Sequence, residues 1–130
     1  MPIEDSYVFS VDPTFNDSYQ DMLKILDHKP TLPTALFAGS DILAFGSIKA
    51  IKETGLSIPE DVSIVGFGDL PLSDIMDAAL TTIKVSKRET GELAMDIVIK
   101  RIEGDIERPP LKILIGGQFI ERGSVKDLMC

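Results

Sequence analysis

The chain has 130 residues, of which 44% are hydrophobic, 6% aromatic and 26% charged, and its formal net charge is −8 at pH 7. This composition is typical of one folded domain or part of one, and it excludes a disordered chain. Thirteen basic residues stand against 21 acidic ones and form no basic stripe that would neutralise phosphates. We therefore do not expect the chain to bind DNA or RNA directly.

Membrane and secretion signals are lacking as well. No apolar run approaches the roughly 20 residues that span a bilayer. The acidic residues 1–5 do not resemble a signal peptide. The single cysteine, Cys130, cannot form an intramolecular disulfide, so an oxidising compartment has no support. We expect a cytoplasmic protein.

The first half of the chain predicts two strands and two helices. Residues 7–11 are β-branched and aromatic, which favours a strand, and residues 15–26 have apolar side chains at helical spacing. Residues 34–38 predict the second strand. Ser40 is the expected N-cap of a helix over residues 41–54. The apolar arc of that helix is wider than one buried stripe requires, so one face is expected to cover a sheet and the other to meet a second subunit.

The second half continues the alternation of strand and helix. Residues 62–67 form a nearly continuous apolar run, typical of a central parallel strand covered on both faces. A strand is predicted over residues 81–85, and the capping-box sequence Ser-Lys-Arg-Glu opens a helix over residues 86–103. Short strands are predicted over residues 111–115 and 118–121. The whole pattern predicts an α/β fold with a mainly parallel sheet.

Polar residues follow the predicted strands, at the ends where ligands bind in such sheets. They are Ser10 and Asp12, Ser40 and Asp41, and Asp69, which follows Gly68. Carboxylates at these places suit a hydroxyl-rich ligand or a divalent metal. His28 is the one histidine, so neither a histidine-based metal site nor Ser-His or Cys-His catalysis has support. We predict no catalytic residue, no metal site and no cofactor.

Five motifs follow one another between residues 33 and 125. They are PTALFAGSD at 33–41, AFG at 44–46, GLSIPEDVSIVGF at 55–67, LTTI at 80–83 and ERGSV at 121–125. With these motifs the chain resembles the carboxyl-terminal part of the effector-binding domain of LacI/GalR (lac repressor/gal repressor) family transcription regulators. The resemblance implies a periplasmic-binding-protein-like (type I) fold, in which two α/β subdomains hold a small molecule between them.

The resemblance also divides the chain. Residues 1–85 and 118–125 are expected to belong to the second subdomain of such a domain, and residues 86–117 to cross back to the first. We expect the family's DNA-binding head to be absent from this chain, so that DNA would be bound only through a head outside it.

Ligand contacts are implied position by position. Ser40 stands where the family commonly has a polar ligand-binding residue. Gly68 stands where the family often has an aspartate, and here the acid comes one place later. An aromatic residue often follows the aspartate matching Asp12, whereas here Pro13 follows and Phe15 is close by. The expected ligand-binding residues are Asp12, Phe15, Ser40, Asp41 and Asp69.

The resemblance further implies a homodimer and a sugar or purine-like effector. The expected dimer contacts are Ile42, Phe45, Ile48, Ile75 and Met76. One alternative function is a solute-binding protein of a sugar transporter. A receiver-like phosphoacceptor domain that uses Mg²⁺ is another, but such a site needs two adjacent acids after the first strand, and Asp12 is followed by a proline.

Overall fold

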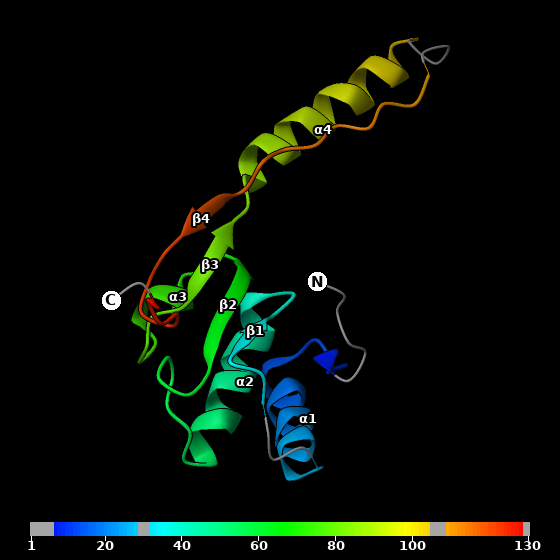
Figure 1. Cartoon of the computed structure of the whole chain (residues 1–130). Helices are drawn as coiled ribbons and strands as arrows, with labels where there is room; N and C mark the ends of the chain where they lie inside the picture. Colours follow the sequence, from blue (N-terminus) through cyan, green and yellow to red (C-terminus); the bar gives the residue numbers. More distant parts are fainter. Residues whose placement is uncertain (1–6, 29–31, 105–108, 129–130) are drawn as a thin grey trace.

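Figure 1 shows a four-stranded sheet with helices packed against it and a long helical arm that projects from one end. This computed structural model describes residues 7–28, 32–104 and 109–128, so Cys130 lies outside the described residues. In chain order the elements are α1 (Phe15–His28), β1 (Ala35–Phe37), α2 (Asp41–Glu53), β2 (Ser63–Gly68), α3 (Leu72–Ile75), β3 (Thr81–Lys84), α4 (Lys87–Ile102) and β4 (Gln118–Ile120).

The strands lie in the order β1-β2-β3-β4. The first three are parallel, with Leu36 opposite Ile64 and Val65 opposite Thr81. Strand β4 runs antiparallel to β3 and places Phe119 opposite Ile83. The predicted mainly parallel sheet is confirmed. Because three strands point the same way, their carboxyl ends meet at one edge of the sheet, which we call the rim.

Helix α2 packs between α1 and the sheet, since it contacts both α1 and β2. Ser40 caps it as predicted, and its Oγ accepts a hydrogen bond from the backbone N–H of Leu43 at 3.4 Å. Phe45 and Ile48 are 3% and 2% exposed within a single chain. The wide apolar arc thus has an explanation inside one chain, because α2 packs against α1 as well as against the sheet. The structure assigns Phe45 and Ile48 to the core rather than to a dimer interface.

The contact between α1 and α2 is close because α2 carries a glycine in its middle. A Cβ atom added at Gly46 would lie 2.0 Å from the Ser18 hydroxyl and 2.8 Å from the Phe15 carbonyl oxygen. Ser18 is itself fully buried. Only a residue without a side chain lets the two backbones approach this far.

Two predicted strands are not strands in the structure. Residues 7–11 and 111–115 pair with no strand. Their β-branched and aromatic side chains favour extended backbone, but a strand also needs a neighbour that supplies the ladder. Residues 7–11 instead line one side of a cavity that β1 lines on the other. Residues 111–115 run beside α4, where no strand lies next to them (Figure 1).

Helix α4 begins at the predicted place without the predicted capping box. The Ser86 side chain makes no capping hydrogen bond. Its carbonyl oxygen instead accepts a hydrogen bond from the Thr90 hydroxyl at 2.8 Å. Backbone angles of φ −72° and ψ 69° place Ser86 outside the extended region that a capping serine normally adopts.

We call α4 together with residues 109–117 the arm. Its two segments lie side by side, and Arg101 donates a hydrogen bond to the Pro109 carbonyl at 3.5 Å. No residue of α4 is buried. At the base of the arm, a Cβ added at Gly117 would lie 2.6 Å from Ile83 Cγ2 and 3.2 Å from the Lys84 carbonyl oxygen. The arm therefore meets the sheet through a close contact of the Gly117 backbone with Ile83 and Lys84.

Across residues 7–28, 32–104 and 109–128, no helix combines the length and the apolar character needed to cross a membrane.

Candidate ligand-binding site

A buried carboxylate organises the rim. Asp41, the first residue of α2, is 0% exposed. Its Oδ2 accepts hydrogen bonds from the backbone N–H of Leu70 at 2.7 Å and from the Ser73 hydroxyl at 2.8 Å, and its Oδ1 accepts one from the Thr82 hydroxyl at 2.6 Å. Three donors satisfy a charge that would otherwise be costly to bury. Asp41 thereby joins α2 to the loop after β2, to α3 and to β3.

Glycines in β2 leave room for this carboxylate. A Cβ at Gly66 would lie 2.3 Å from Asp41 Oδ1, and Gly68 has a φ of +131°, which side chains rarely adopt. Both oxygens of Asp41 have protein donors, and the side chain has no contact with solvent. The prediction that Asp41 contacts a ligand has no counterpart in this geometry, because its carboxylate is fully buried and bonded to donors of the protein.

An arginine organises the other side of the rim. The guanidinium of Arg122 donates to Asp69 Oδ1 at 2.8 Å and to the Leu80 carbonyl at 2.9 Å, and its Nε lies 3.5 Å from Asp74. The Arg122 and Asp69 side chains are each 16% exposed. Asp69 has a left-handed φ of 50°. This backbone conformation is unfavourable for a residue with a side chain and persists only where surrounding contacts hold it. The ion pair fixes this turn directly after β2.

Ser124 holds the segment after β4 against strands β2 and β3. Its side chain is fully buried. The hydroxyl accepts a hydrogen bond from the backbone N–H of Thr81 at 2.8 Å and donates one to the Ile64 carbonyl at 2.6 Å. The Thr81 hydroxyl in turn accepts from the backbone N–H of Arg122 at 2.9 Å. Arg122 is therefore held by its backbone as well as by its side chain.

Between the ends of β2 and β3 and the start of α4 lies a pocket of about 360 Å³, which we call the rim pocket. It is lined by Gly68, Asp69, Lys84, Val85, Ser86, Lys87, Arg88 and Glu89. Of the predicted ligand residues, Asp69 is the one that lines it.

The other predicted ligand residues lie apart from Asp69. Ser40 is half-buried, whereas Asp12 and Phe15 are exposed. The backbone N–H of Asp12 donates to the Asp21 carboxylate at 3.2 Å. The pKa of Asp21 is lowered, mainly by the hydrogen bond from the Lys24 ammonium and then by the hydrogen bond from this N–H. These contacts fix the start of α1. Among the residues that the structure describes, no side-chain hydrogen bond joins Asp12 or Ser40 to Asp69.

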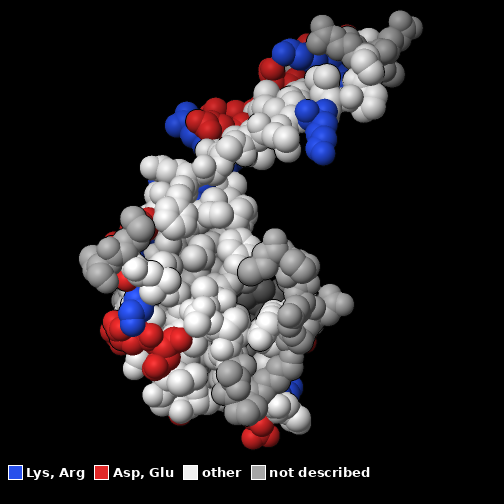
Figure 2. All heavy atoms as spheres, viewed as in Figure 1, with Lys and Arg blue, Asp and Glu red and all other residues white. Residues whose placement is uncertain are grey.

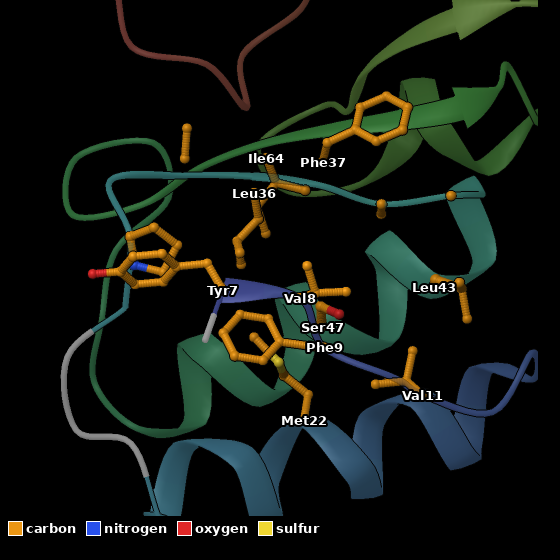
Figure 3. Close-up of a pocket in the computed structure, with 14 residues that line it drawn as sticks. Tyr7, Val8, Phe9, Val11, Met22, Leu36, Phe37, Leu43, Ser47 and Ile64 are labelled. Atoms are coloured by element: carbon orange, nitrogen blue, oxygen red, sulfur yellow. The ribbon is translucent and has the colours of Figure 1, made fainter. Parts of the chain in front are cut away.

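A larger cavity of about 700 Å³ lies between residues 7–11, β1, α1 and α2. Figure 3 shows apolar side chains around it. Tyr7, Val8 and Phe9 come from one side, Leu36 and Ile64 from the sheet, and Met22 from α1. Ser47 adds a hydroxyl. Such a lining fits an apolar group and offers no charged partner to a polar ligand. Neither this cavity nor its residues were predicted.

Reasoning from the sequence also missed the roles of Arg122, Ser73 and Thr82. Their partners stand 53, 32 and 41 residues away along the chain, so no local spacing reveals them. The only available signal was that Arg122 and Thr82 occur within the motifs ERGSV and LTTI. In the part of the chain that the structure describes, no group of three or more His, Cys, Asp or Glu residues is arranged to hold a metal ion.

Comparisons with known proteins match this architecture. Residues 2–125 match the family model "Periplasmic binding protein-like domain". The ribose operon repressor of Escherichia coli K12 is 39% identical over 102 residues, which cover 78% of this chain and 31% of the repressor. The transcriptional repressor PurR of Glaesserella parasuis is 34% identical over 131 residues, which cover 97% of this chain and 38% of PurR.

Solved structures agree. A LacI family transcriptional regulator from Enterococcus faecium, with bound ribose, superimposes with a TM-score of 0.73 at 30% identity, covering 88% of this chain and 41% of that one. The chain thus spans about a third of the length of the curated relatives it matches. The predicted resemblance to LacI-type regulators and the predicted fold are both confirmed, and the chain belongs to the periplasmic binding protein-like domain family.

Proposed function

We propose that this chain is the effector-binding and dimerisation region of a LacI-type transcriptional regulator, and that it is not an enzyme. The observation that carries the proposal is the rim: Asp41, from the first of the five motifs, and Arg122, from the last, hold the strand ends at the edge where α/β sheets bind ligands. A regulator is favoured over a transporter's solute-binding protein because the matched relatives are named repressors. On the same ground we propose that the protein acts in the cytoplasm.

The effector class follows from the relatives. One relative is a ribose operon repressor and one matched structure holds ribose, so a sugar is the first candidate, ahead of a purine-like molecule. We propose that Ser40 and Asp69 face this ligand, with Asp12 and Phe15 at its outer side. Asp41 positions the loop after β2.

Subdomain roles follow the same scheme. Residues 1–85 and 118–125 would form the second subdomain, and residues 86–117, which make up the arm, would cross to the first. The dimer surface would use the exposed apolar residues among those expected. Ile42 is 38% exposed, Ile75 is 75% exposed, and Met76 is half-buried. A regulator of this kind works because ligand and operator DNA each favour one of two states of the whole protein.

A thermal-denaturation screen tests the effector proposal. The chain is heated with ribose, other pentoses and hexoses, and nucleosides. A ligand that binds only the folded state raises the midpoint in a concentration-dependent way. A screen in which no sugar or nucleoside shifts the midpoint at millimolar concentration would contradict the proposal. In an electrophoretic mobility assay the chain alone is expected to leave operator DNA unshifted.

A further inference from the structure

The rim pocket has an unusual charge for this protein. The chain carries a net charge of −8, yet three of the eight residues that line the pocket are cationic and two are acidic. The cationic residues are Lys84, Lys87 and Arg88. The charge of the residues that line the rim pocket therefore differs from the net charge of the whole chain.

The two acids of the pocket offset this charge only in part. Asp69 is engaged by Arg122, which lies outside the pocket lining, so the negative charge of Asp69 is balanced by the cation it binds. Gly68 beside it has no side chain. Glu89 is exposed in the first turn of α4 and is the remaining acid of the lining.

The two lysines are the cations left without a counter-charge. Arg88 binds Glu92 at 2.7 Å on the helix surface. The side chains of Lys84 and Lys87, both exposed, take part in none of the ion pairs or hydrogen bonds formed within residues 7–28, 32–104 and 109–128. Two unpaired ammonium groups against one carboxylate leave the pocket with an excess of one positive charge.

We propose that the effector bound at the rim carries an anionic group, the phosphate of a phosphorylated sugar, and that Lys84 and Lys87 bind it. This inference rests on the proposed function and narrows its ligand class. A sugar phosphate would place its hydroxyls near Asp69, at the end of β2, and its phosphate between the two lysines. An ammonium group binds phosphate as a compact point charge with several donors.

Calorimetric titration of the chain tests this assignment with three probes: ribose, ribose 5-phosphate and inorganic phosphate. We expect ribose 5-phosphate to bind at least tenfold more tightly than either of the others. Lys84→Gln and Lys87→Gln should each weaken its binding about fivefold, the upper range for an exposed ion pair. Raising the salt concentration from 0.05 to 0.5 M should erase most of the difference, because salt screens exposed charges.

Two control variants separate charge from folding. Lys112→Gln removes an exposed lysine of the arm that does not line the rim pocket, and it should leave the affinity unchanged. Lys84→Arg keeps the charge and should keep the affinity for ribose 5-phosphate within about twofold, as expected when charge rather than exact shape is recognised. Thermal midpoints of all four variants should match that of the parent chain, since both pocket lysines are exposed.

The outcomes distinguish this inference from the proposed function. Equal affinity for ribose and ribose 5-phosphate, with no effect of Lys84→Gln, would overturn the anionic ligand and leave a neutral sugar sensor standing. Inorganic phosphate binding as tightly as ribose 5-phosphate would show a simple anion site and would also overturn it. If no sugar, nucleoside or sugar phosphate bound at all, both the inference and the proposed function would fall.

Discussion

The body and the arm of this protein are held together by different means. In the body, the carboxylate of Asp41 is buried and meets partners from distant elements. In the arm, no residue of α4 is buried. Two of its ion pairs, Arg88 with Glu92 and Lys100 with Asp96, link residues four apart on the helix. Figure 2 shows Lys, Arg, Asp and Glu side chains close together along the arm. Long-range contacts therefore stabilise the body, and local ones stabilise the arm.

The largest expected effect comes from replacing the buried carboxylate of the body. Asp41→Ala leaves three buried donors without an acceptor and should lower the free energy of unfolding by about 3–5 kcal/mol. Urea denaturation followed by circular dichroism measures it. The matched variant in the arm, Asp96→Asn, breaks an exposed pair and should cost less than about 0.5 kcal/mol. Comparable losses for the two variants would abolish the distinction between body and arm.

Glycine-to-alanine substitutions in the body and in the arm should change the stability of the protein in opposite directions. Gly46→Ala forces a Cβ into Ser18 and the Phe15 carbonyl and should cost about 1–3 kcal/mol. Gly91 lies in α4 with nothing within 4 Å of an added Cβ. Gly91→Ala should therefore raise the helical signal and stabilise the helix by up to about 1 kcal/mol. Destabilisation by Gly91→Ala would show that α4 is covered in solution.

Breaking the ion pair between Asp69 and Arg122 is expected to have the next largest effect on the free energy of unfolding. Arg122→Met removes the partner of a mostly buried carboxylate and should cost about 2 kcal/mol. A double-mutant cycle with Asp69→Asn isolates the pair, and a coupling of roughly 1 kcal/mol or more is expected. Strict additivity of the two single variants would mean that Asp69 is held in its left-handed turn by other contacts.

The smallest effect concerns acid titration on the surface of the body. Lys52, first by its hydrogen bond and then by its charge, lowers the pKa of Asp77 below the usual value. A carboxyl whose pKa is lowered by folding adds stability above its unfolded pKa and loses it as the pH falls through the folded one. Asp77→Asn should therefore be slightly less stable than the parent at pH 7 and equally stable near pH 2. Denaturation midpoints across that range measure the difference, and a constant gap at all pH values would contradict the assignment.

Prediction from the sequence succeeded where the cause of a structure is local. Helix α2 was correctly placed because its cap, Ser40, lies at its own start. Strand β2 was recognised because a strand covered on both faces is apolar at nearly every position. Residues 7–11 have comparable side chains, yet they form no strand. Whether an extended segment joins a sheet depends on a neighbour elsewhere in the chain.

Long-range pairing also limited what could be said of the site. Asp41 was recognised as polar and well placed, but its partners, Leu70 and Thr82, follow 29 and 41 residues later. A sequence alone does not reveal that such donors close around a carboxylate and withdraw it from solvent. The expected dimer residues Phe45 and Ile48 illustrate a related limit, because an apolar arc in the sequence does not show that these side chains are buried within a single chain.

The contact at Gly117 has a mechanical consequence. The arm is attached by two adjacent passes of the chain, one leaving β3 and one entering β4, and these strands are antiparallel neighbours. Gly117 presses against Ile83 and Lys84 at that junction. A swing of the arm therefore acts as a lever with its pivot at the paired strands. Such a swing would twist Lys84 on one pass and Gln118, its partner in the sheet, on the other.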